Sequence, residues 1–333
     1  MKCYLSKILF SAIVSIAIVG TVRVNAGDPG GTCYSPFFSA VEEGEIFSGF
    51  FPFSSVLFAQ PSYDGGHGII LPEFDHIEKW EWHDKGPSVG SNDPVIFVEP
   101  EREYTYRMYV HHDGGQDLYR SKNAAHWELV EKNVIPSGGG TNFNWGRKGP
   151  DGNYYLYRTV KDEYTELWWG ETLTELENKG KVLDEPDAGG YYDPKEQKWH
   201  MYYEGIPGKG SPCSVTIDHA VSNDGIHWEK KGIALDVRDQ DWKTGDPDVV
   251  RIGDTYHMFV DRTAPDHTSY KIAVATSKNL NKFELREEPI TEFYGGDACV
   301  RYVPEQNRFV MYVEFYGENH SGIGWGVSQR VSN

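Results

Sequence analysis

Short hydrophobic and aromatic runs recur along the chain, separated by polar turns, and one of these runs repeats five times. It places aromatic and apolar residues around a central methionine or leucine, at residues 106–110, 154–157, 199–203, 256–260 and 309–313. The central residues are 48, 45, 57 and 53 residues apart, and they are Met108, Leu156, Met201, Met258 and Met311. Runs of this kind between turn residues are typical of β-strands. The spacing predicts a repeated strand unit in which methionine fills the core.

An acidic residue opens a second strand upstream of the aromatic run in four of the five copies. The strand begins Asp-Pro or Asp-Ala, and the acid precedes the central residue of its copy by 15, 14, 12 and 14 residues. These acids are Asp93, Asp187, Asp246 and Asp297. The second copy has no acid there and reads Thr-Asn-Phe-Asn-Trp at residues 141–145. The repeat predicts that the four aspartates occupy equivalent places in the fold.

A polar turn follows the aromatic run and leads into further strands. It reads Ser-Asn-Asp-Gly-Ile-His-Trp at residues 222–228, and the same six-residue step joins Ser121 to Trp127 and Ser277 to Phe283. Turns rich in Asp-Gly and Asn connect antiparallel strands, so Asp224 is expected to be a structural turn residue. Each copy then holds about four strands, the size of a propeller blade. The chain is predicted to be all-β, a five-bladed β-propeller of four-stranded antiparallel blades.

The last copy lacks its outer strand, and a segment before the first copy resembles that strand. The last copy ends at residues 324–328, and residues 78–86 carry the matching pattern Glu-Lys-Trp-Glu-Trp-His-Asp-Lys-Gly. An N-terminal strand there would close the ring and cover an exposed sheet edge. We therefore expect the propeller at residues 78–333, with residues 27–77 as an N-terminal extension that packs on it.

The first 26 residues have the pattern of a secretory signal peptide. Lys2 and Lys7 precede the apolar run 8–20, and a small-residue cleavage site ends at Ala26. The sequence thus predicts a secreted or periplasmic protein with no membrane span in the mature chain. Cleavage would take the formal charge from −18 to −21, which disfavours nucleic acid as a partner. The cysteines left after cleavage show no zinc spacing, and the sequence alone does not pair them.

The Asp-Pro and Asp-Ala strand starts, together with the Ser-x-Asp-Gly-x-x-Trp turn, resemble the five-bladed furanosidase superfamily of glycoside hydrolases. The resemblance is to family 43, and also to families 32, 68, 117 and 130, over roughly residues 78–333. It implies a propeller whose central carboxylates cleave glycosidic bonds. It says little about the sugar, because these folds act on many sugars.

The resemblance assigns three catalytic positions. Asp93, in Asn-Asp-Pro, matches the base or nucleophile of the first blade, and Asp187 matches the aspartate that modulates the acid. Asp246 lies where the family carries its glutamate general acid. Because an aspartate stands there, the identity of the acid stays open between Asp246, Glu204 and Glu185.

Four further residues are candidates for contact with the substrate. Trp145 and Arg147 follow the acid-free start of the second copy and could form a stacking wall and a polar clamp. The alternative is a buried tryptophan and a surface arginine. Glu204 and Asp297 complete the substrate-binding candidates, although the family plan does not require an acid in the fifth blade.

No metal-ligand motif is present, and no cofactor is expected to be required. The resemblance allows a structural Ca²⁺ in the central channel, since some family members hold a cation there with a histidine, for which His320 is the candidate.

The leading expectation is a secreted glycoside hydrolase acting on plant or algal oligosaccharides or polysaccharides. A carbohydrate-binding propeller without catalysis is an alternative, because the fourth-blade glutamate is missing. A glycoside phosphorylase is another alternative, and it would need a basic phosphate pocket.

Overall fold

The computed structural model describes most of the repeat region. The described residues are 80–83, 92–112, 115–124, 126–136, 144–207, 213–263, 270–286, 289–291, 294–303, 306, 308–316 and 321–328, with the backbone of 19–20, 23–25, 32–34 and 38–39. The chain divides into two units, Met1–Gln60 and Pro61–Asn333. In the first, β1 (Val19–Gly20) pairs with β4 (Phe38–Ser39), and β2 (Arg23–Asn25) pairs with β3 (Thr32–Tyr34), both antiparallel. Most of the predicted signal peptide, most of the predicted extension 27–77 and His320 lie outside the described residues.

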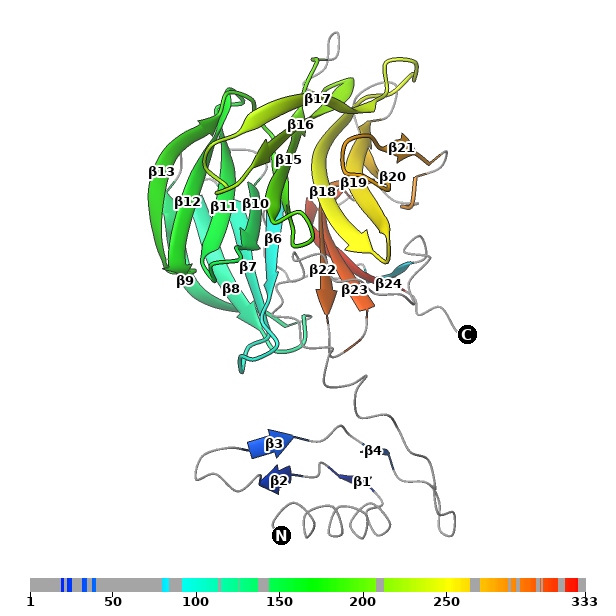
Figure 1. The fold of residues 1–333 in the computed structure, drawn as a ribbon. Helices are drawn as coiled ribbons and strands as arrows, with labels where there is room; N and C mark the ends of the chain where they lie inside the picture. The colour runs from blue at the N-terminus through cyan, green and yellow to red at the C-terminus, as the bar shows by residue number, and fades with distance from the viewer. Residues whose placement is uncertain are drawn as a thin grey trace. The chain divides into compact units, whose positions relative to one another are not determined.

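The second unit is a five-bladed β-propeller of four-stranded antiparallel sheets (Figure 1), as the repeat predicted. Blade one is β6 (Asn92–Val98), β7 (Tyr106–His112), β8 (Gly115–Ser121) and β9 (Glu128–Pro136). Blade two is β10 (Asn144–Lys148), β11 (Tyr154–Val160), β12 (Tyr164–Thr172) and β13 (Glu175–Leu183). Blade three is β14 (Gly189–Asp193), β15 (Lys198–Glu204), β16 (Thr216–Ser222) and β17 (Glu229–Asp236). Blade four is β18 (Thr244–Ile252), β19 (Thr255–Thr263), β20 (Tyr270–Ser277) and β21 (Glu284–Leu285).

Blade five combines the two ends of the propeller sequence. Its strands are β22 (Gly295–Val303), β23 (Arg308–Tyr316), β24 (Ser321–Ser328) and, as the outer strand, β5 (Trp80–His83). Strand β5 runs antiparallel to β24, with Trp80 opposite Ser328 and His83 opposite Trp325. The prediction that an N-terminal strand closes the ring is confirmed. The backbone groups of β24 that would form an open edge are thereby paired.

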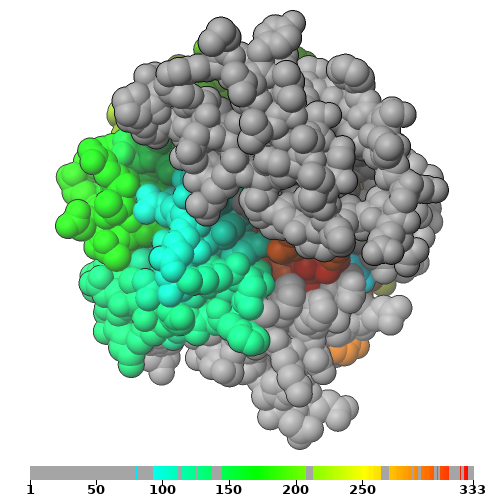
Figure 2. Space-filling view, turned by 90° about the horizontal axis from the view of Figure 1, so that it is seen from below, coloured from blue at the N-terminus to red at the C-terminus, as the bar shows by residue number. Residues whose placement is uncertain are grey.

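The innermost strands β6, β10, β14, β18 and β22 each contact the next around the ring, and β22 contacts β6. Seen from below, the residues of blades one and two form one continuous surface, coloured cyan to green (Figure 2). The blades pack through the repeated aromatic strands, whose central residues Met108, Leu156, Met201, Met258 and Met311 are all 0% exposed. The role of methionine as core filling is confirmed.

The polar turns of three blades share one hydrogen-bond pattern. The serine hydroxyl accepts the backbone N–H two residues on, in Ser121–Asn123 at 3.2 Å, Ser222–Asp224 at 3.1 Å and Ser277–Asn279 at 3.2 Å. The Asp224 carboxylate then accepts the N–H groups of Ile226 and His227, each at 2.9 Å. Asp224 is therefore a turn residue, as predicted.

Among the described residues, no helix is both long and apolar enough to cross a lipid bilayer. Cys213 and Cys299 are buried in separate blades, and the Cys299 sulfur accepts the Ile96 N–H at 3.3 Å across the boundary of blades five and one.

Candidate active site

The four repeated aspartates share an unusual backbone conformation. Their φ angles are +55° for Asp93, +48° for Asp187, +48° for Asp246 and +53° for Asp297. In blades one, four and five the strand pairing shifts register at this point, as in a β-bulge. Left-handed φ is uncommon for a residue with a Cβ, and Asp is among the types that tolerate it. Because bulges redirect side chains, the same local distortion aims the carboxylates of Asp93, Asp246 and Asp297 in the same way.

A second set of side chains comes from the second strand of each blade, three residues after the central methionine or leucine. Strand pairing places Asp261 opposite Gly245, Glu314 opposite Gly296 and His111 opposite Asn92. The positions occupied in this set are His111, Thr159, Glu204, Asp261 and Glu314. Three of the five are therefore acids, and each lies beside the first set of aspartates.

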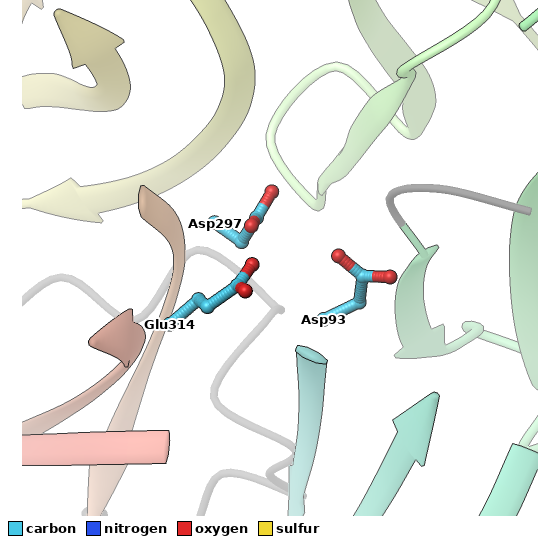
Figure 3. Close-up of side chains that lie close together, drawn as sticks. All are labelled: Asp93, Asp297 and Glu314. Carbon is cyan, nitrogen blue, oxygen red and sulfur yellow. The ribbon is translucent and has the colours of Figure 1, made fainter. Parts of the chain in front are cut away.

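Seven carboxylates from these two sets form what we call the acid cluster: Asp93, Asp187, Glu204, Asp246, Asp261, Asp297 and Glu314. Their ligand oxygens form three groups in which all oxygens lie within 4.8 Å of one another: Asp93–Asp297–Glu314, Asp187–Glu204–Asp246 and Asp246–Asp261–Asp297. Figure 3 shows the first group, with the three carboxylates turned toward one another. Asp246 and Asp297 each belong to two groups, so the cluster is continuous. The structure brings together Asp93, Asp187, Asp246, Glu204 and Asp297, all of them site candidates from the sequence.

Two glycines leave room for the acids of the preceding blade. A Cβ at Gly245 would lie 2.2 Å from the Glu204 Oε1, and a Cβ at Gly296 would lie 2.3 Å from the Asp261 Oδ2. These distances are too short for any side chain. A side chain before Asp246 or before Asp297 would therefore displace the Glu204 or the Asp261 carboxylate from its present place in the cluster.

Burial and mutual repulsion keep protons on much of the cluster. Burial raises the pKa of Asp187 to about 7, the Thr159 hydroxyl lowers it, and the charges of Asp162 and Asp93 raise it. Burial, followed by neighbouring carboxylates, raises the pKa of Glu204, Asp246 and Asp297 well above the usual range. Burial does the same for Asp261, although the Asp297 N–H lowers it. An enclosed carboxyl that stays protonated near neutral pH can act as a general acid.

Asp93 has a histidine neighbour on the adjacent strand. The His111 Nδ1 lies 3.4 Å from the Asp93 Oδ2. His111 comes from β7 and Asp93 from β6, so the two belong to one blade. This contact distinguishes Asp93 from Asp187, Asp246 and Asp297, because their blades hold an acid in the equivalent place.

A buried ion network joins the innermost strands. Asp248 accepts hydrogen bonds from the Trp145 Nε1 at 3.0 Å, the Arg147 Nη2 at 2.6 Å, the Arg301 Nη1 at 2.9 Å and the Val300 N–H at 2.6 Å. Arg301 also donates to the carbonyls of Ile96 and Gly146, each at 2.9 Å. These bonds connect blades one, two, four and five, so the network ties the ring together.

Trp145 and Arg147 belong to this network, and each is only 1% exposed. A ring so enclosed cannot stack on a sugar, and a guanidinium already bonded to Asp248 cannot clamp a substrate. The prediction that they bind substrate therefore does not fit the packing. The tryptophan is buried, as the alternative stated, and the arginine is buried with it because residues two apart on β10 face the same side.

Glu185 is not part of the acid cluster. Its carboxylate pairs with the Lys230 ammonium on β17. Of the three candidates for the general acid, Asp246 and Glu204 lie in the cluster and Glu185 does not.

Sequence reasoning missed Asp261, Glu314 and Thr159. The signal was available, because each lies three residues after the central residue of its blade. The pattern was overlooked because those positions hold His, Thr, Glu, Asp and Glu in turn, and no single residue type repeats.

We predict that the protein loses stability as the pH rises above about 6.5. A carboxyl whose pKa is higher in the folded state holds a proton that the unfolded chain has released, so each such proton costs about 1.4 kcal/mol per pH unit. For Asp187 that interval runs from about 4 to about 7, and burial raises the pKa of Glu204 well above its usual range in the same direction. Below about 6.5 the histidines oppose the trend, because burial lowers the pKa of His200 and of His257 to about 4.

Denaturant unfolding across pH 6 to 9 would measure this slope. Glu204→Gln should flatten it, and Glu177→Gln, at a solvent-exposed ion pair with Lys179, should leave it unchanged. A wild-type stability that rises with pH over this interval would contradict the prediction.

Comparison with known proteins gave matches by structure alone. No family model matches the sequence, and no curated protein matches it. Among solved structures, a thermostable family-43 glycoside hydrolase superposes with a TM-score of 0.60 at 16% identity, covering 74% of this chain and 91% of that one. The chain has the five-bladed propeller fold of the family 43 glycoside hydrolases.

Two arabinan-cleaving enzymes share the same fold. The endo-arabinase from Bacteroides thetaiotaomicron VPI-5482 has a TM-score of 0.58 and 13% identity, covering 76% of this chain and 98% of that one. An exo-1,5-alpha-L-arabinanase from a bovine ruminal metagenomic library has a TM-score of 0.56 and 16% identity, with 75% and 95% covered. At these identities the similarity shows the fold, and the function has to be argued from the site.

Proposed function

We propose that this protein is a glycoside hydrolase whose reaction takes place at the acid cluster. The observation that carries the proposal is the convergence of seven carboxylates from four blades in the fold of family 43, several of them held protonated. Cleavage of a glycosidic bond needs one carboxylic acid to protonate the leaving oxygen and one carboxylate to activate water or attack the anomeric carbon. A cluster with both charged and protonated members supplies the two roles.

Asp93 is the proposed base or nucleophile. It opens the inner strand of blade one, and the His111 Nδ1 lies 3.4 Å from its Oδ2. An ionised carboxylate in that place is suited to accept a proton from water or to bond to the sugar.

Asp246 is the proposed general acid, and Asp187 is proposed to modulate it. Asp246 sits in blade four, and its oxygens group with those of Asp187 and Glu204. Burial raises its pKa well above the usual range, and the charges of Asp261, Asp187 and Glu204 raise it further. Glu204 shares these properties, so it is the second candidate for the acid. Asp246→Asn and Glu204→Gln distinguish the two candidates. The variant that lacks the general acid should still cleave substrates whose leaving group needs no proton, and should lose activity on the others.

The proposed substrates are neutral plant or algal oligosaccharides and polysaccharides, beginning with arabinan. Two of the similar structures are named as arabinan-cleaving enzymes. A cluster of carboxylates would also repel an anionic polymer. Export of the protein, for which the N-terminal pattern is the support, would bring it to polymers outside the cell.

A panel of aryl glycosides and neutral polysaccharides tests the proposal, with Asp93→Asn beside the wild type. Release of sugar by the wild type and its loss in the variant would support hydrolysis. Binding to a glycan array without cleavage would favour a carbohydrate-binding propeller, and cleavage that requires phosphate would favour a phosphorylase.

A calcium ion in the channel remains part of the proposal. Asp93, Asp297 and Glu314 offer carboxylate oxygens within 4.8 Å of one another, and Ca²⁺ prefers oxygen ligands. A bound ion would stabilise the ionised carboxylates around it. Ca²⁺ added in excess over a chelator control should then reduce the loss of stability above pH 6.5, and an unchanged pH slope would remove the ion from the proposal.

A further inference from the structure

A buried threonine of blade two contacts Asp187 across the blade boundary. The Thr159 Oγ1 accepts the backbone N–H of Asp187 at 2.7 Å, and Thr159 is 1% exposed. The boundary between blades four and five repeats the contact, where the Asp261 Oδ1 accepts the Asp297 N–H at 3.0 Å. The position three residues after the central residue therefore holds the aspartate of the next blade at both boundaries. The accepting side chain is a threonine at the first boundary and an aspartate at the second.

The contact is made to a peptide whose backbone conformation is disfavoured. Asp187 has a φ of +48°, which is disfavoured for a residue with a Cβ. A hydrogen bond to its N–H limits how far this peptide can turn, and the carboxylate direction follows from the backbone. The Thr159 hydroxyl also lowers the pKa of the Asp187 carboxyl, as expected of a neighbouring hydroxyl that favours the charged form. Since the Asp187 Oδ1 has no hydrogen-bond partner among the described residues, Thr159 provides a large share of what orients this group.

Within the part of the chain that the structure describes, the other titratable groups that face Asp187 are acids. They are Asp162 from the turn after β11, Asp93 from β6, Glu204 from β15 and Asp246 from β18. Blades three, four and five place a carboxylate at the position of Thr159, namely Glu204, Asp261 and Glu314. A neutral hydroxyl in blade two can donate to the carboxylate as well as accept from the N–H, which an ionised carboxylate cannot do.

We propose that Thr159 is a positioning residue that fixes both the left-handed backbone and the carboxylate of Asp187 from the neighbouring blade. The proposal rests on the proposed function insofar as Asp187 modulates the general acid. Its geometric part, that Thr159 fixes the conformation and lowers the pKa of Asp187, can be tested whether or not the protein is an enzyme.

Thr159→Val removes the hydroxyl and keeps the shape of the side chain. The apparent pKa of Asp187 should then rise by about one unit, a tenfold gain in proton affinity, because a donor to the charged form is lost. It is measured by ¹³C NMR of aspartate labelled at the carboxyl carbon, with the Asp187 resonance assigned by its absence in Asp187→Asn. On a substrate found by the panel, kcat should fall about tenfold and its pH profile should shift the same way. Thr159→Ser, which keeps the hydroxyl, should restore both.

Thr165→Val is the matched control. Thr165 lies opposite Thr159 on β12, is also 1% exposed, and donates its hydroxyl to the Glu185 carbonyl at 2.8 Å. Thr165→Val also removes a buried hydroxyl from this hairpin, but that hydroxyl bonds to the Glu185 carbonyl and not to Asp187. A general loosening of the blade would therefore move both variants alike. If Thr159→Val does not fold, Thr159→Ala removes the same hydroxyl with less bulk.

The outcomes separate this inference from the proposed function. A shifted Asp187 titration in Thr159→Val that Thr159→Ser reverses supports the positioning role, even if no substrate is found. An unshifted titration, or an equal shift in Thr165→Val, overturns it, even if the wild type is an active hydrolase.

Discussion

Asp93→Asn is expected to lower kcat/KM for the glycoside substrate by about 10²–10⁴-fold, the range lost when a general base is removed. The amide keeps the size of the side chain but cannot take up a proton or attack the sugar. Stability should be unchanged or slightly higher, because one acid leaves a cluster of seven carboxylates. Initial rates and thermal unfolding, measured on the same samples, check both parts.

The matched control for this substitution is Asp224→Asn. Asp224 caps a turn, and asparagine already holds the equivalent place in two other blades, at Asn123 and Asn279. The same chemical change there should leave both kcat/KM and thermal unfolding as in the wild type. Activity that survives in Asp93→Asn within twofold would remove Asp93 from the reaction.

Asp248→Ala is expected to lower the free energy of unfolding by about 3–5 kcal/mol, the range for breaking a buried ion pair from one side. Asp248 is 1% exposed and accepts hydrogen bonds from two arginines, a tryptophan and a backbone N–H. Without it, the Arg147 and Arg301 guanidiniums stay buried with their common carboxylate gone. Denaturant unfolding followed by tryptophan fluorescence would measure the loss.

A surface ion pair provides the comparison for Asp248. Asp236 pairs with Arg238, and both side chains are largely in solvent, 39% and 53% exposed. Asp236→Ala should cost no more than about 1 kcal/mol, because water screens exposed pairs. Equal losses from the two variants would show that the buried network does not hold the blades together.

The repeat in the sequence predicted most of the architecture. A residue type that recurs at one position from blade to blade, such as the methionine that four of the five aromatic strands carry, marks a position whose surroundings also repeat. The same logic put Asp93, Asp187, Asp246 and Asp297 in register from their spacing alone. It also identified β5, since an incomplete last blade and a matching segment before the first one belong together.

Contacts between blades could not be read in this way. Trp145 and Arg147 looked available for substrate because they lie in the copy that lacks an acid, yet Asp248 of blade four encloses them. Asp261 and Glu314 went unnoticed because the residue types at their position vary from blade to blade.

The sequence by itself determined the strand order, the number of blades, the closing strand and the four repeated aspartates, because each follows from a spacing along one chain. The tertiary structure alone decided which side chains of neighbouring blades meet: Thr159 with Asp187, Glu204 with Gly245, and Arg301 with Asp248. These partners lie 28 to 53 residues apart with no common interval. Their meeting depends on how the twisted sheets pack around the axis, and the hydrophobic pattern of a single strand carries no record of that packing.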